Sequence, residues 1–278
     1  AGYARLAEEL HRPYLLGYVD SIPATRAHLE GRFDDMARLV GAQLGHSEGA
    51  YAARAQQAYR WQMRLLRLDL GRIDDELLED LTEVAEQYPG PTSTTMLALA
   101  YATIHRRAEG MARLAGLPSE ALPAIPRDIM WSATLAMLSR AVIRLGAVAY
   151  APPIYELLAP HAERDCLWGS GLMTLGPIRR YLGMLATTLG EPDLALSHLE
   201  HAFERCLSLG SPSLAARTKM EMARALQVRR RDGDVARMRT LLEEAGQSAA
   251  ELGMPGLADT TRRMLAEIGV HASEAAVS

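Results

Sequence analysis

The sequence is poor in the residues that build β-sheets and in those that cross-link a chain. Aromatic residues make up only 5% of the 278 residues, and β-branched residues are sparse beside alanine and leucine, so a β fold is not expected. The two cysteines, Cys166 and Cys206, lie forty residues apart. They match neither a C-x-x-C motif nor a zinc-ligand spacing, which favours a reducing cytoplasm over a disulfide framework.

Lysine is almost missing as well, because Lys219 is the only one and nearly every positive charge is an arginine. The net charge is -4, whereas non-specific nucleic-acid binding needs a basic surface. The longest apolar run covers residues 96–104 and is too short to cross a bilayer; no signal peptide is visible. We therefore expect a cytoplasmic protein without direct nucleic-acid or membrane contact.

Glycines recur at the ends of amphipathic segments and mark a repeat. The five that do so, spaced 40, 75, 44 and 43 residues apart, are Gly31, Gly71, Gly146, Gly190 and Gly233. A less regular turn near Arg107 would divide the long interval, which gives about six units of roughly forty residues. In each unit, apolar residues at i, i+3 and i+4 lead to a glycine that can close a helix in the left-handed conformation.

Aspartates then open the second helix of several units. A carboxylate in the first turn caps free amide groups and complements the helix dipole. These aspartates are Asp34, Asp35, Asp74, Asp75 and Asp193. Their recurrence at one repeat position favours capping over acid–base catalysis.

The clearest unit covers residues 181–209. The positions that match the tetratricopeptide pattern in type and spacing are Leu182, Gly183, Ala186, Gly190, Ala195, Leu199 and Ala202. The small residues let two helices approach closely, while Leu182 and Leu199 fill the seam between them. We therefore predict an all-α fold: a tetratricopeptide-like α-solenoid of about six antiparallel helix pairs forming a right-handed superhelix.

We expect residues 1–270 to form a single helical repeat domain and residues 271–278 a frayed tail. The expected helices include residues 2–10 and 172–189. Residues 118–128 carry three prolines and residues 160–171 are rich in Pro, Gly and polar side chains, so both stretches are expected to be loops or turns.

One stretch resembles a known family. Residues 154–161, followed by Arg164-Asp165 and Gly169, resemble an "LYxLLxPYxxR" segment, and the resemblance extends over about residues 126–254. This region is similar to the tetratricopeptide-like C-terminal helical part of actinobacterial LuxR-type and adenylate/guanylate-cyclase-type signal-transduction ATPase regulators. The resemblance implies a helical sensor or scaffold arm whose catalytic and DNA-binding parts lie in other domains. A first residue that is Ala rather than Met fits an excised segment of a larger protein.

Motifs for chemistry are weak. His198 and His201 have the i, i+3 spacing of a metal-binding pair, but they fall on the outer side of a second helix, which favours a solvated face. Residues 169–171 read Gly-Ser-Gly without the lysine of a phosphate-binding loop, so a turn is favoured over anion binding at the next helix. With no G-x-S-x-G or H-E-x-x-H motif, we predict no enzyme, no metal and no cofactor.

A binding groove is the better candidate. In helical solenoids the first helix of each pair lines a concave surface. Counting back from the turns gives these groove residues: Trp61, Leu65, Tyr101, His105, Arg140, Arg144, Arg180, Met184, Gln227 and Arg230. They predict an acidic or carboxylate-bearing segment held by arginine forks, with an apolar part near Trp61 and Tyr101. The alternatives are that the two aromatic residues belong to the core and that the arginines are a solvated surface.

The sequence thus predicts a non-enzymatic module of a larger signalling or transcriptional regulator. It would bind a partner protein, a peptide or a small inducer and pass that event to an attached effector domain. Two alternatives stay open. One is a helical small-molecule pocket with catalytic use, and the other is a homodimerisation arm built on an apolar stripe near Leu241, Leu252, Leu257 and Met264.

Overall fold

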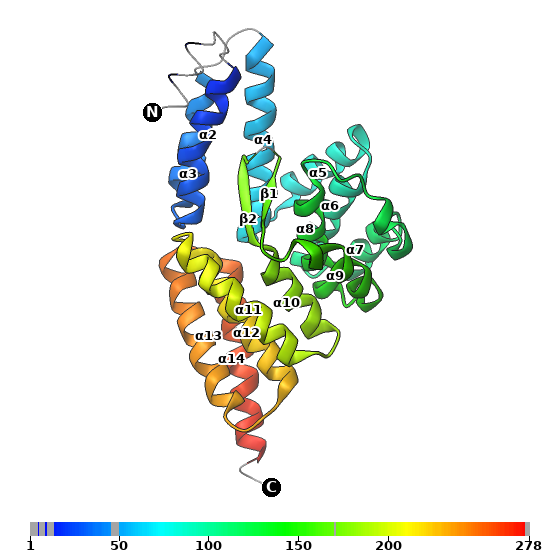
Figure 1. Cartoon of the computed structure of the whole chain (residues 1–278), viewed down its shortest axis with the longest axis vertical. Helices are drawn as coiled ribbons and strands as arrows, with labels where there is room; N and C mark the ends of the chain where they lie inside the picture. Colours follow the sequence, from blue (N-terminus) through cyan, green and yellow to red (C-terminus); the bar gives the residue numbers. More distant parts are fainter. Residues whose placement is uncertain (1–4, 6–8, 10–13, 46–49, 170, 276–278) are drawn as a thin grey trace.

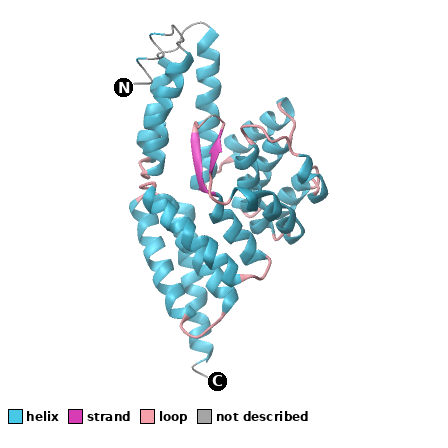
Figure 2. Cartoon of the chain, viewed as in Figure 1, coloured by secondary structure: helices cyan, strands magenta, loops and turns pink. Residues whose placement is uncertain are grey.

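The computed structural model describes residues 5, 9, 14–45, 50–169 and 171–275, and these residues are mostly helical (Figure 2). The long helices are α2 (Tyr14–Leu29), α3 (Phe33–Gly45), α4 (Ala50–Leu70), α5 (Asp75–Gln87), α6 (Pro91–Thr103), α7 (Arg107–Leu114), α8 (Trp131–Leu145), α9 (Ala151–Leu158), α10 (Ile178–Thr188), α11 (Pro192–Ser208), α12 (Pro212–Arg229), α13 (Asp234–Glu251) and α14 (Pro255–Ala275). Short 3₁₀ helices are η1 (Ser119–Ala124), η2 (Val148–Tyr150) and η3 (Ala159–His161), and the strands are β1 (Asp165–Trp168) and β2 (Met173–Pro177). The expected helix over residues 2–10 falls almost wholly outside the described residues.

The predicted turns are confirmed, except that α12 ends at Arg230 and Gly233 begins α13 instead of closing α12. All five marker glycines have a positive φ, between 66° at Gly146 and 83° at Gly233. The less regular turn near Arg107 is also present, where His105 takes the left-handed conformation with φ 62° between α6 and α7. Asp74 caps α5, because its side chain accepts a hydrogen bond from the amide of Leu77 at 2.9 Å.

Consecutive helices pack against each other along the chain. Contacts join α10 to α11, α11 to α12, α12 to α13 and α13 to α14, and one cluster of buried apolar side chains reaches from Ala24 to Ile268. Gly183 sits at the closest approach of α10 and α11, where a Cβ would lie 2.5 Å from Cγ of Leu199. Leu182 and Leu199 are fully buried, as the repeat pattern predicts.

A two-stranded hairpin interrupts the helices. Strands β1 and β2 pair antiparallel where we expected a loop over residues 160–171 and a helix over residues 172–189, so α10 begins only at Ile178. The reason lies in Gly176-Pro177: proline disfavours a helical conformation in the preceding residue, and Gly176 has φ 90°. The turn glycines Gly169 and Gly171 also have positive φ.

The first helices contact the last, which an arrangement limited to neighbouring repeats would not allow. Helix α2 packs on β2 and α12, and α4 packs on α14 (Figure 1). Thr25 Oγ1 and Gln62 Nε2 both donate to the carbonyl oxygen of Leu172 in the hairpin, at 3.0 and 2.8 Å. Arg72 Nη2 donates to the carbonyl oxygen of Gly253 at 3.3 Å. The chain therefore closes on itself around the hairpin.

The C-terminal end differs from expectation in two ways. Helix α14 continues to Ala275, past residue 270, where we expected regular structure to end. The apolar stripe proposed for a dimer is also covered by the chain itself, since Leu257 and Met264 are buried and Leu241 and Leu252 pack partly buried on the same core.

Among the described residues, no helix has the length and apolarity to cross a bilayer.

The close approach at Gly183 gives a stability test. Gly183→Ala places a methyl group against Leu199 and should lower the free energy of unfolding by about 2 kcal/mol, as overpacking does. Gly41→Ala is the matched control, because a Cβ there meets only Cε2 of Tyr59 at 3.9 Å; it should raise the free energy of unfolding by about 0.5 kcal/mol through helix propensity. Urea denaturation measures both, and equal effects would contradict the proposed packing.

Candidate functional site

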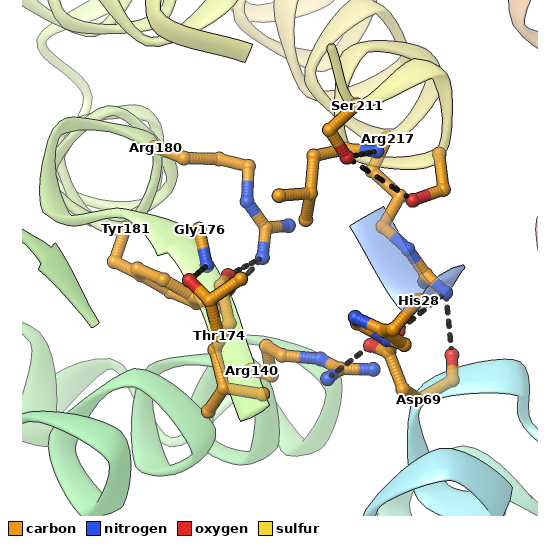
Figure 3. Close-up of polar contacts among 12 residues, drawn as sticks. His28, Asp69, Arg140, Thr174, Gly176, Arg180, Tyr181, Ser211 and Arg217 are labelled. Atoms are coloured by element: carbon orange, nitrogen blue, oxygen red, sulfur yellow. Dashed lines mark hydrogen bonds and ion pairs between the residues drawn. The ribbon is translucent and has the colours of Figure 1, made fainter. Parts of the chain in front are cut away.

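Asp69 lies at the centre of a buried ion-pair network (Figure 3). It sits in the last turn of α4 and its side chain is 8% exposed. Arg140 on α8 donates from Nη1 to Oδ1 at 3.1 Å. Arg217 on α12 donates from Nη2 to Oδ2 at 3.1 Å and to the backbone carbonyl oxygen of Asp69 at 2.7 Å. One carboxylate thus joins three helices that are far apart in sequence.

The charges of these arginines keep Asp69 ionised. Burial alone would raise its pKa, but the charge of Arg217, the contact with His28 and the charge of Arg140 outweigh burial and hold the pKa well below the ordinary value. A carboxylate near a helix C-terminus is unfavourable by itself, so the arginines also offset the dipole of α4. His28 Nε2 is 3.4 Å from Oδ2, which is long for a hydrogen bond, and we treat this contact as electrostatic.

Arg180 on α10 is buried without a carboxylate partner. The residue is 3% exposed, and its Nη2 donates to the carbonyl oxygen of Leu175 at 3.2 Å and to Tyr181 Oη at 2.6 Å. Its Nε has no hydrogen-bond partner among the described residues, and neither does Nε of Arg217. Burial alone would lower the pKa of Arg180, but Tyr181 and the charges of Asp69 and Glu221 outweigh burial and raise it. Arg180 therefore stays charged in the interior without forming an ion pair of its own, which is unusual for a buried charge.

Two further arginines lie where the cluster opens to solvent. Arg144, one turn after Arg140 on α8, is exposed and donates from Nη1 to Thr103 Oγ1. Arg224 on α12 is 29% exposed, and its Nη1 lies 3.7 Å from Oε2 of the buried Glu221. The cluster therefore runs from buried Arg180 to a solvent-facing end at Arg144 and Arg224.

Burial and like charges lower the pKa values of two members of the cluster. The pKa of Arg144 falls to about 9 through desolvation and the like charges of Arg140 and Arg224. The pKa of Arg217 falls to about 10 through burial, partly offset by Asp69. Guanidinium groups stay protonated in proteins, so Arg144 and Arg217 both keep their positive charge.

The cluster has a surplus of positive charge. The five arginines are Arg140, Arg144, Arg180, Arg217 and Arg224, and the two carboxylates are Asp69 and Glu221. The two carboxylates neutralise two of the five arginines, so three positive charges remain. His28 is left out of this count. Such a surplus at a partly buried site favours binding of an anion. We call these seven residues and His28 the arginine cluster.

Comparison with protein-family models, curated proteins and solved structures found no match to this chain. The likeness of residues 126–254 to helical regions of LuxR-type and cyclase-type regulators therefore stays a prediction.

The structure brings together only part of the predicted groove. Arg140, Arg144 and Arg180 meet in the arginine cluster. Met184 and Leu65 are buried in the core. Gln227 and Arg230 are exposed at the end of α12, where Arg230 Nε donates to the carbonyl oxygen of Gln227.

Sequence reasoning missed Asp69, His28, Arg217, Glu221 and Arg224. For α12 the error has a simple cause. Arg230 has φ 54° and ends the helix, three residues before Gly233. Counting back from Arg230 instead of Gly233 moves the first groove position from Gln227 to Arg224. Asp69 and His28 carried no signal, because they come from the first units and reach the cluster only through the closure of the chain.

The predicted aromatic part of the groove lies elsewhere. Trp61 is half-buried, its ring 5.7 Å from that of Trp168 and 5.0 Å from Cζ of Arg64. It lines an open pocket of about 300 Å³ together with Arg60, Arg64, Gln57, Gln87 and Tyr88. Tyr101 is buried under Arg106, as the core alternative predicted, and His105 forms an exposed turn.

The histidine pair is not a uniformly solvated face. His198 is half-buried between α9, α10 and α11, with Nε2 2.9 Å from Tyr155 Oη and Nδ1 3.3 Å from Arg179 Nη1. Burial and the charge of Arg179 lower its pKa. His201 is exposed. No group of His, Cys, Asp and Glu among the described residues is arranged to hold a metal ion.

The two buried arginines should respond differently to substitution. Arg180→Met removes a charge without a carboxylate partner, and Tyr181 Oη still donates to the carbonyl oxygen of Leu175, so the free energy of unfolding should change by less than about 1 kcal/mol. Arg217→Met removes one of the two arginines bound to Asp69 and should cost about 3 kcal/mol. Urea denaturation of both variants checks this, and a loss from Arg180→Met as large as that from Arg217→Met would show that Arg180 serves the fold.

The ion pairs of Asp69 should also shape acid unfolding. A carboxyl group whose pKa is lowered in the folded state contributes stability that is complete above its unfolded pKa of about 3.9 and is lost as the pH falls through the folded value. Asp69→Asn should therefore lower the free energy of unfolding at pH 7 by about 3 kcal/mol and flatten its decline below about pH 4. Urea midpoints measured across this range test both effects; a variant with the wild-type slope would contradict them.

Proposed function

We propose that this chain is a non-enzymatic regulatory module that binds an acidic ligand at the arginine cluster and passes that event to an effector domain of a larger signalling or transcriptional regulator. The ligand is either an acidic segment of a partner protein or a small anionic inducer. The observation that carries the proposal is the surplus of arginine over carboxylate at a site that runs from the core to the surface.

The position of the cluster in the fold supports this proposal. We propose that the helix pairs form a tetratricopeptide-like superhelix, in which the first helix of each pair faces inward. Helices α8, α10 and α12 are the first helices of their pairs, and they carry Arg140, Arg180 and Arg217. Contacts of α10 with both α8 and α12 are in line with a shared inner face.

The chemistry of the cluster suits binding better than catalysis. Guanidinium groups are not deprotonated near neutral pH and so cannot act as a general base there, and a carboxylate with a strongly lowered pKa, such as Asp69, is a weak base. The thiol of Cys166 is fully buried, which raises its pKa to about 12, far from that of an activated nucleophile. These properties support recognition of an anion without a chemical step.

The proposal is tested by measuring how acidic probes bind to the wild type and to a variant that lacks Arg144 and Arg224. An oligoglutamate peptide and citrate are titrated at low salt, because exposed charge interactions are screened as salt rises. At least one probe should bind, and the double variant R144Q/R224Q should weaken it about tenfold or more, which corresponds to the roughly 1.4 kcal/mol expected for losing two charge-assisted contacts. Fluorescence anisotropy and isothermal titration calorimetry give the affinities.

The control keeps the net charge of the double variant. Arg113 on α7 and Arg263 on α14 are exposed, and neither contributes to the arginine cluster. R113Q/R263Q should leave the affinity within about twofold of the wild type, since distant exposed charges are screened. Equal losses in both double variants, or no binding of either probe, would defeat the proposal.

A further inference from the structure

The buried end of the arginine cluster has hydrogen-bond donors that the chain does not use. Nε of Arg180 and Nε of Arg217 have no partner among the described residues. Both side chains are at least nine-tenths buried. A guanidinium group offers five donors in a rigid fork, of which Arg180 uses only Nη2 in the bonds found here. Buried donors are normally satisfied, so these groups are suited to the oxygens of a bound anion.

The arginine cluster is exposed to solvent at one end only, among its arginines. Arg140, Arg180 and Arg217 are buried, whereas Arg144 is exposed and Arg224 is partly exposed. Because the last two side chains are long and reach solvent, they can fold over a group that enters between them.

The density of charge sets the kind of anion. An extended peptide spaces successive residues about 3.3 Å apart and points alternate side chains to opposite sides, so it brings few carboxylates to one point. It would also have to bury backbone amides among guanidinium groups, which cannot accept a hydrogen bond. A compact polyanion places its charges on one small group made of acceptor oxygens.

We infer that the acidic ligand is a compact anion with two or more negative charges, of the phosphoryl or polycarboxylate class, held by Arg180 at its inner end and by Arg144 and Arg224 at its solvent end. This inference rests on the proposed function and narrows its ligand. Burial is the first cause of the lowered pKa of Arg144, and the like charges of Arg140 and Arg224 add to it. An anion beside Arg144 would relieve that repulsion.

The experiment compares compact and extended anions on the full chain. Pyrophosphate, citrate and the monoanion acetate are titrated beside the oligoglutamate peptide, with affinity from calorimetry and Tm from thermal unfolding. Pyrophosphate or citrate should bind at least about tenfold more tightly than oligoglutamate, and at about a hundredfold excess over Kd it should raise Tm by about 5 °C. Acetate is the control for charge number and should leave Tm unchanged. Pyrophosphate against citrate separates the phosphoryl from the carboxylate source.

Variants of Arg180 test the inner contact. R180K keeps the charge but loses the planar fork, and R180M loses both, so both should reduce the affinity for the compact anion by about tenfold or more. Because either side chain leaves the ion pairs of Asp69 in place, near-UV circular dichroism and Tm of the free variants show whether they fold. R113Q/R263Q again serves as the variant with unchanged binding.

The outcomes separate the inference from the proposed function. If oligoglutamate binds more tightly than the compact anions, and R180K and R180M bind their ligand as tightly as the wild type, the inference of a compact ligand is refuted and the proposed function still stands. Failure of every anion to bind overturns both. Binding of pyrophosphate or citrate that R144Q/R224Q weakens and R180M does not would place the anion at the surface and refute the inner contact.

Discussion

The ion pairs of Asp69 with Arg140 and Arg217 are the interaction on which the closed arrangement of the chain depends. They tie α4 to α8 and α12, whose arginines lie 71 and 148 residues further along the sequence. An exposed ion pair contributes little, but this one is buried, and removal of one partner from a buried pair leaves an uncompensated charge that costs about 3–5 kcal/mol. Thr25 and Gln62 add two hydrogen bonds to the hairpin, yet the charges decide which helices come together in the interior.

The same cluster holds more positive charge than the fold needs. Asp69 is satisfied by Arg140 and Arg217, and Arg180 adds only hydrogen bonds to Leu175 and Tyr181. Burial of Arg180 costs desolvation, which Tyr181 and the charges of Asp69 and Glu221 offset although neither carboxylate forms an ion pair with it. Residues that break local rules in this way are expected at functional sites, and for this reason we place the ligand at the arginine cluster rather than at the open pocket beside Trp61.

Much of the local structure could be predicted from the sequence, because it is set by short-range chemistry. The positive φ of Gly31, Gly71 and Gly146, the cap at Asp74 and the close approach at Gly183 all follow from neighbours within one repeat. The hairpin was missed because Met173 and Leu175 fit a buried helix as well as a buried strand. The Gly176-Pro177 pair was the available signal against the helix.

The site was predicted only where it depends on one helix at a time. Arg140 and Arg144 lie one turn apart on α8, and Arg180 follows from the repeat pattern of α10. Asp69 and His28 join them only through contacts between the first and later units, which no local pattern encodes. The contact between the first and later helices is a long-range property. The charged residues that form it lie on helices that the sequence gives no reason to pair.

The geometry of the cluster also sets the sign of the coupling between ligand and closure. A ligand that took Arg140 and Arg217 away from Asp69 would compete with the ion pairs that close the chain. A ligand held by Arg180, Arg144 and Arg224 uses arginines that do not contact Asp69, so competition is small. Its charge instead relieves the repulsion that Arg144 exerts on its neighbours. Because coupling is reciprocal, an anion bound in this way stabilises the closed arrangement, and closure in turn strengthens binding.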